Sequence, residues 1–70
     1  MEATFVLFVR KEQRSRVRNS LTPELLGAAT WRERKTLSGS EFYFSGPSAI
    51  ARLAHAAAAR LTSSADPFHR

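Results

Sequence analysis

The sequence contains no cysteine, and the residue types on which most catalytic sites depend are scarce. It has two histidines and one aspartate, and of these three only His55 lies outside the last five residues. Without cysteine there is no thiol nucleophile, no thiolate ligand for a metal ion and no disulfide framework. The sequence therefore favours binding over catalysis, and we expect no enzymatic activity, no metal site and no cofactor.

Long apolar runs are also missing, since none approaches the roughly 20 residues that a bilayer requires. Glu2 stands where a signal peptide carries positive charge, and the apolar run at residues 5–9 is too short for the hydrophobic part of such a peptide. The absence of cysteine fits a reducing compartment. We expect a cytoplasmic protein without a membrane partner.

Positive charge, in contrast, is abundant. Eleven Lys and Arg against six Asp and Glu give the 70 residues a formal net charge of +5. Such an excess favours association with nucleic acid or with an acidic protein surface. Arginine, whose planar fork grips phosphate or carboxylate through two hydrogen bonds, outnumbers lysine nine to two. An Arg-rich and Ala-rich composition also arises from genomic base composition, so the excess alone does not establish binding.

The first half of the chain predicts one strand and one short helix. Residues 5–9 form a continuous run of β-branched and aromatic side chains, typical of a strand buried on both faces, and we predict the central strand there. Farther on, Thr22 is a suitable N-cap, Pro23 suits the first helical position and Gly27 suits the end of a helix. These signals predict a short helix that directs two leucines toward the core.

The middle of the chain predicts a hairpin. Ser38, Gly39 and Ser40 are typical of a turn between a polar strand at residues 30–37 and an alternating strand at residues 41–45. The polar strand is expected at an edge of the sheet. A helix continuing from residue 23 to residue 35 stays open as an alternative.

The last predicted element is an amphipathic helix that starts near Pro47. Its apolar face is expected to contain Ile50, Leu53, Ala54, Ala57, Ala58 and Leu61. The predicted fold class is therefore α+β: a small three-stranded sheet with a short helix and with the C-terminal helix packed on one face. We expect one domain at residues 1–63 and a disordered tail at residues 64–70.

A basic segment follows the first strand. It carries Arg10, Lys11, Arg14, Arg16 and Arg18. As a helix it would align three of the arginines at intervals of four residues, and as an extended chain it would turn all four to one side. Both geometries predict an aligned basic surface.

A second basic cluster lies on the polar strand of the hairpin. Arg32 and Arg34 share a face there with Lys35 beside them, and Tyr43 lies across from Arg34 in one of the registers that the loop allows. Arginine beside an exposed aromatic ring suits phosphate contact together with base stacking. The alternative reading is that a charged edge strand only prevents aggregation.

These residues define the predicted partner-binding site. We expect a non-enzymatic basic module that binds nucleic acid or works within a nucleic-acid machine. One alternative is a small inhibitor or adaptor that covers an acidic patch on a larger enzyme. A second is a self-assembling structural domain, and a homodimer stays open.

Overall fold

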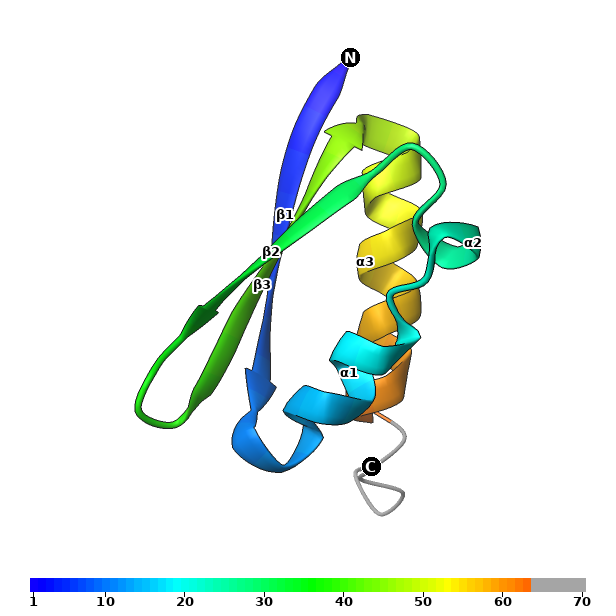
Figure 1. The fold of residues 1–70 in the computed structure, drawn as a ribbon. Coiled ribbons are helices and arrows are strands. Elements are labelled where there is room, and N and C mark those ends of the chain that lie inside the picture. The colour runs from blue at the N-terminus through cyan, green and yellow to red at the C-terminus, as the bar shows by residue number, and fades with distance from the viewer. Residues whose placement is uncertain (64–70) are drawn as a thin grey trace.

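The computed structural model describes residues 1–63, which form an antiparallel sheet with helices on one of its sides (Figure 1). The strands are β1 (Glu2–Arg10), β2 (Thr30–Lys35) and β3 (Gly39–Pro47). The helices are the 3-10 turn η1 (Lys11–Gln13), α1 (Arg14–Ser20), α2 (Pro23–Leu26) and α3 (Ser48–Ser63). The predicted α+β class, with a three-stranded sheet and a C-terminal helix packed against it, is confirmed. The predicted tail at residues 64–70 lies outside the described residues.

The strand order is β1-β3-β2, so β3 is the central strand. The prediction that residues 5–9 form the central strand was therefore wrong. β2 and β3 pair as a hairpin, which leaves the second edge of β3 free for β1 to pair along its whole length. The alternative helix over residues 23–35 is excluded because residues 30–35 form β2. The turn also ends earlier than predicted, since β3 already begins at Gly39.

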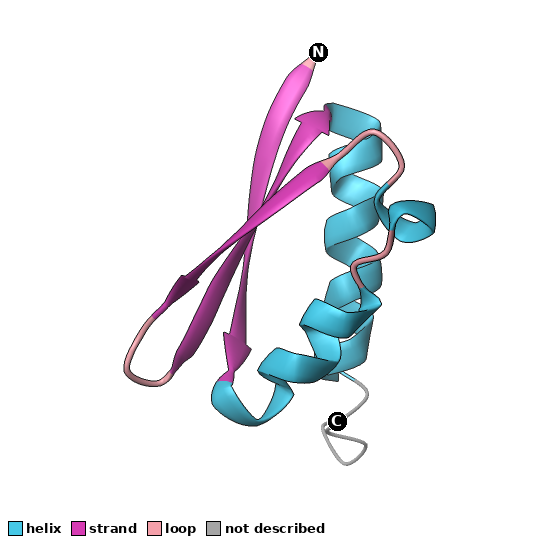
Figure 2. Cartoon of the chain, in the orientation of Figure 1, coloured by secondary structure: helices cyan, strands magenta, loops and turns pink. Residues whose placement is uncertain are grey.

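Within residues 1–63, only one face of the sheet is covered. All the helices within residues 1–63 lie on the same side of it (Figure 2). On that side Val9, Phe42 and Phe44 are fully buried, whereas Val6 and Phe8 on the opposite side are 52% and 49% exposed. The prediction that residues 5–9 are buried on both faces was wrong, because a continuous apolar run does not reveal that one of its faces lacks a covering layer.

Small side chains allow α3 to lie close to the sheet. Ala51, Ala54 and Ala58 are fully buried along one side of the helix. Leu53, predicted on the same side, is 68% exposed. At about 100° per residue it lies roughly 200° around the helix from Ala51. The buried stripe thus follows the alanines, which permit close packing, and excludes the larger leucine.

The local signals for α2 are confirmed. The backbone N–H of Leu25 donates to Thr22 Oγ1 at 3.3 Å, Pro23 is the first helical residue, and Gly27 ends the helix with a positive φ of 60°.

No helix in the described part of the chain is long and apolar enough to cross a bilayer.

Candidate functional site

The side of the sheet that faces away from the helices forms a surface that we call the open face. It consists of alternate residues of the three strands, and no element within residues 1–63 covers it. Its members are Glu2, Thr4, Val6, Phe8 and Arg10 on β1, Gly39, Glu41, Tyr43, Ser45 and Pro47 on β3, and Thr30, Arg32 and Arg34 on β2.

The register of the strands arranges these residues in rows across the sheet. One row runs from Val6 through Tyr43 to Arg32. The next runs from Phe8 through Glu41 to Arg34. The open face therefore changes from apolar on β1 to basic on β2. Tyr43 lies across from Arg32 and not from Arg34, because the turn occupies residues 36–38, two residues earlier than predicted, and this sets the register of the hairpin.

Contacts on the open face hold its polar side chains in place. The guanidinium carbon of Arg32 lies 5.6 Å from the centre of the Tyr43 ring. Arg34 donates to Glu41 Oε1 through Nε at 3.0 Å, and its Nη2 lies 2.9 Å from the same oxygen. The Tyr43 hydroxyl also donates to this oxygen, at 2.8 Å. The bonds from Tyr43 and Arg34 keep the pKa of Glu41 below its usual value, and the carboxylate raises the pKa of Arg34.

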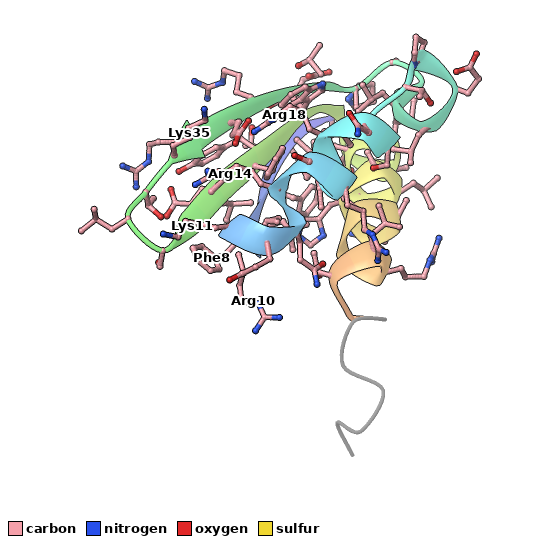
Figure 3. The ribbon with its side chains drawn as sticks, turned by 60° about the horizontal axis from the view of Figure 1, so that its bottom comes forward. Phe8, Arg10, Lys11, Arg14, Arg18 and Lys35 are labelled. Atoms are coloured by element: carbon pink, nitrogen blue, oxygen red, sulfur yellow. The ribbon has the colours of Figure 1, made fainter. Side chains whose placement is uncertain are left out.

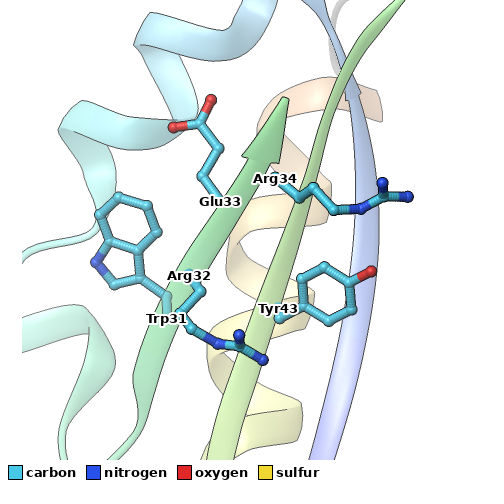
Figure 4. Close-up of a pocket in the computed structure, with 5 residues that line it drawn as sticks. All are labelled: Trp31, Arg32, Glu33, Arg34 and Tyr43. Atoms are coloured by element: carbon cyan, nitrogen blue, oxygen red, sulfur yellow. The ribbon is translucent and has the colours of Figure 1, made fainter. Parts of the chain in front are cut away.

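A hollow extends along β2 and is lined from both sides of this strand (Figure 4). Arg32, Arg34 and Tyr43 lie on the side of the open face, whereas Trp31 and Glu33 point toward α1. The Trp31 ring stacks on Phe42 with 5.6 Å between the ring centres. Trp31 thus belongs to the edge of the core, and the two arginines are the exposed residues that line this hollow on β2.

The arginines of α1 are engaged within the molecule. Arg14 donates through Nε to Ser40 Oγ at 2.7 Å and through Nη2 to the carbonyl oxygen of Gly39 at 2.9 Å. Arg18 grips both carboxylate oxygens of Glu33 at 3.0 Å, and the Ser40 hydroxyl donates to the same carboxylate at 2.7 Å. The bond from Arg18 is the main reason that the pKa of Glu33 lies below its usual value. These contacts attach α1 to the covered face of the sheet.

The predicted alignment of the basic segment was therefore wrong. The chain continues as strand to Arg10, turns through η1 and becomes helical only at Arg14, so Arg10 is not in line with Arg14 and Arg18. Val17, which is fully buried, draws that side of α1 onto the sheet. Arg14 and Arg18 turn inward with it, and Arg16 stays exposed.

The structure brings a different set of predicted residues together. Arg10 pairs with Gly39 and Lys35 pairs with Ser40, so both lie at the same end of the sheet, and Lys11 follows directly in η1 (Figure 3). All three are exposed, and none forms a salt bridge with another described residue. Together with Arg32, Arg34 and Tyr43 they border or occupy the open face.

Three residues of the rows that contain Arg32 and Arg34 were not among the predicted site residues. Val6 and Phe8 were assigned to a buried strand, and Glu41 carried no signal of its own. Only the alternation of exposure along β1, which the structure reveals, identifies the two apolar residues as surface positions.

His55 is a boundary residue of α3. Its Nε2 donates to the carbonyl oxygen of Val6 at 3.0 Å, and its ring lies 6.0 Å from the rings of Phe5 and Phe44. Within residues 1–63 no three His, Asp or Glu side chains are grouped so that they could hold a metal ion.

Comparison with known proteins finds no match, neither to a family model, nor to a curated protein, nor to a solved structure. The geometry of the open face is therefore the basis for inferring function.

Proposed function

We propose that this chain is a non-enzymatic module that binds nucleic acid through the open face. The observation that carries the proposal is the combination, on one uncovered sheet surface, of exposed apolar and aromatic side chains with arginines in the same rows. Aromatic rings on a sheet provide stacking surfaces for bases, and neighbouring arginines bind phosphates. Exposed apolar side chains next to cations suit a ligand that is itself both apolar and anionic.

The distribution of charge supports the same partner. Arg32 and Arg34 line β2, and Arg10, Lys11 and Lys35 gather at one end of the sheet. Arg34 uses two nitrogens on Glu41, and its side chain is still 65% exposed, so other N–H groups remain for a phosphate. The proposed site of action is the cytoplasm.

Arg14 and Arg18 have a different role in this proposal. They hold α1 against the covered face through Ser40 and Glu33. We therefore assign phosphate contact to the arginines of β2 and fold stability to those two arginines of α1.

The test is a comparison of two double variants of the full chain by fluorescence anisotropy with a labelled mixed-sequence oligonucleotide. R32A/R34A removes two charges from the open face, and R52A/R60A removes two exposed charges from α3. We expect the first variant to bind roughly tenfold more weakly, and the control to stay within about threefold of the original chain. The slope of log affinity against log salt should also fall by about 1.4 to 1.8 in R32A/R34A, for two lost phosphate contacts.

Equal losses in the two variants would show that net charge, and not the open face, governs binding. No binding at any salt concentration would refute the function itself. A pull-down with and without nuclease then identifies the rival partner, because a complex with an acidic protein survives nuclease treatment.

A further inference from the structure

We infer that the nucleic acid on the open face is a single strand, with its phosphates along β2 and its bases over Tyr43 and β1. This inference rests on the proposed function and specifies its ligand. It follows from an asymmetry of the open face, which is apolar on β1 and basic on β2 in the rows of Arg32 and Arg34. A surface that carried only positive charge would not have this asymmetry.

The open face is apolar toward β1 and basic toward β2. In two successive rows the residue on β1 is apolar, Val6 or Phe8, and the residue on β2 is an arginine. The two arginines are two residues apart in a strand, so their Cα atoms are about 6.6 Å apart along β2. A chain of phosphates that follows β2 can thus meet one arginine per nucleotide step, while its bases extend toward β1.

The centre of the open face offers no cation of its own. Glu41 lies between Phe8 and Arg34, and its carboxylate is held there by Tyr43 and Arg34. Because β3 contributes a carboxylate and no basic side chain to these two rows, the phosphates have their cationic partners on β2. The same carboxylate can accept hydrogen bonds from the amino groups of bases.

The exposed apolar side chains of β1 suit a single strand better than a duplex. Val6 and Phe8 are 52% and 49% exposed, Val6 in the row of Tyr43 and Phe8 in the next row, and they add apolar surface to that of the Tyr43 ring. A duplex keeps the faces of its bases inside the stack and offers little apolar surface in its grooves apart from the thymine methyl group. A single strand can splay its bases onto aromatic side chains. Only the single strand therefore uses the apolar half of the open face.

The experiment measures the affinity of the full chain for a mixed-sequence 12-nucleotide DNA and for the corresponding 12-base-pair duplex. The variant is Y43L, which removes the ring, and its matched control is Y43F, which keeps the ring and loses only the hydroxyl. Loss of one stacked base lowers affinity by roughly five- to hundredfold. We expect that loss for Y43L with the single strand, no more than about a twofold change with the duplex, and single-strand binding by Y43F within about threefold of the original chain.

A second measurement needs no variant. Tyr43 is the only tyrosine of the chain, so its ring protons give a single set of NMR signals. Stacking of a base should move these signals upfield when the single strand is added, and addition of the duplex should leave them in place.

The outcomes separate the two proposals. If the duplex binds as tightly as the single strand and R32A/R34A weakens both, the open face binds nucleic acid but the single-strand inference is wrong. The inference is also wrong if Y43L and the original chain bind the single strand equally and the tyrosine signals do not move. If neither nucleic acid binds, or binding does not depend on Arg32 and Arg34, both proposals are wrong.

Discussion

Substitution of Ser40 by alanine tests whether the inward-facing arginines of α1 stabilise the fold. Ser40 is fully buried, and its hydroxyl is the link between Arg14 and Glu33. It accepts a hydrogen bond from Arg14 and donates one to Glu33, each at 2.7 Å. Alanine fits the same space and removes both bonds.

The expected loss follows from these two bonds. A hydrogen bond to a charged partner contributes about 1.5–3 kcal/mol when its loss leaves that partner unsatisfied. Arg14 keeps its bond to the carbonyl of Gly39, and Glu33 keeps both bonds from Arg18. We therefore expect the free energy of unfolding to fall by about 2–3 kcal/mol in S40A, near the lower end for two bonds. A domain of this size has only about 3–5 kcal/mol in total, so the variant should retain no more than roughly 60% of its stability.

The assay is urea denaturation followed by circular dichroism. With a slope of about 1 kcal/mol per molar, the midpoint should fall by about 2–3 M. The matched control is S45A on the same strand, where the Ser45 hydroxyl makes an exposed bond of 3.0 Å to Thr4. It should cost no more than about 0.5 kcal/mol. Equal effects of S40A and S45A would refute the assignment of a structural role to this network.

Two further predictions concern the same region. The bond from Arg18 is the main reason that the folded-state pKa of Glu33 lies below the ordinary value of 4.5. As the pH falls, the unfolded chain therefore binds the proton first, so the stability from this carboxylate is complete above pH 4.5 and is lost as the pH falls from there through the folded pKa. In urea denaturation between about pH 7 and pH 3, the free energy of unfolding should fall less in E33Q than in the original chain, and an equal fall would contradict this cause. G39A should destabilise by about 1–3 kcal/mol, because a Cβ at Gly39 would collide with the carbonyl oxygen of Val9. The control in the same denaturation assay is S38A, at the exposed residue before Gly39, and it should change the free energy of unfolding by less than about 0.5 kcal/mol. If G39A also changes it by less than about 0.5 kcal/mol, β1 moves away from the added Cβ and the predicted collision is wrong.

Three elements of this fold, α2, β3 and α3, were predictable because each carries a local signal. Thr22, Pro23 and Gly27 fix the ends of α2 through a side-chain cap, a suitable first residue and a positive φ. The alternation of Phe42 and Phe44 with polar neighbours identifies β3, and the alanine stripe of α3 repeats with the period of a helix. Each of these signals lies within a few consecutive residues, so it can be recognised without the position of the rest of the chain.

The arrangement of the basic segment was not predictable in the same way. Whether Arg14 and Arg18 face outward depends on Val17, which is buried by contact with a sheet whose other strands come later in the chain. Glu33 and Ser40, their partners, lie 15 and 26 residues away from Arg18 and Arg14. The sequence therefore shows where the arginines are, but it does not show which of them bind within the molecule and which are exposed.

The error about β1 is informative about function. The run from Phe5 to Val9 is apolar at every position, although within residues 1–63 only one face of this strand is buried. A strand with one face in water usually alternates between apolar and polar residues, so the exposed Val6 and Phe8 depart from the pattern that solubility favours. Exposed apolar residues that break this pattern are expected where a surface binds a partner. The rows that continue from these two residues end in Arg32 and Arg34, and this is why we place an apolar and anionic ligand, and not a purely ionic one, on the open face.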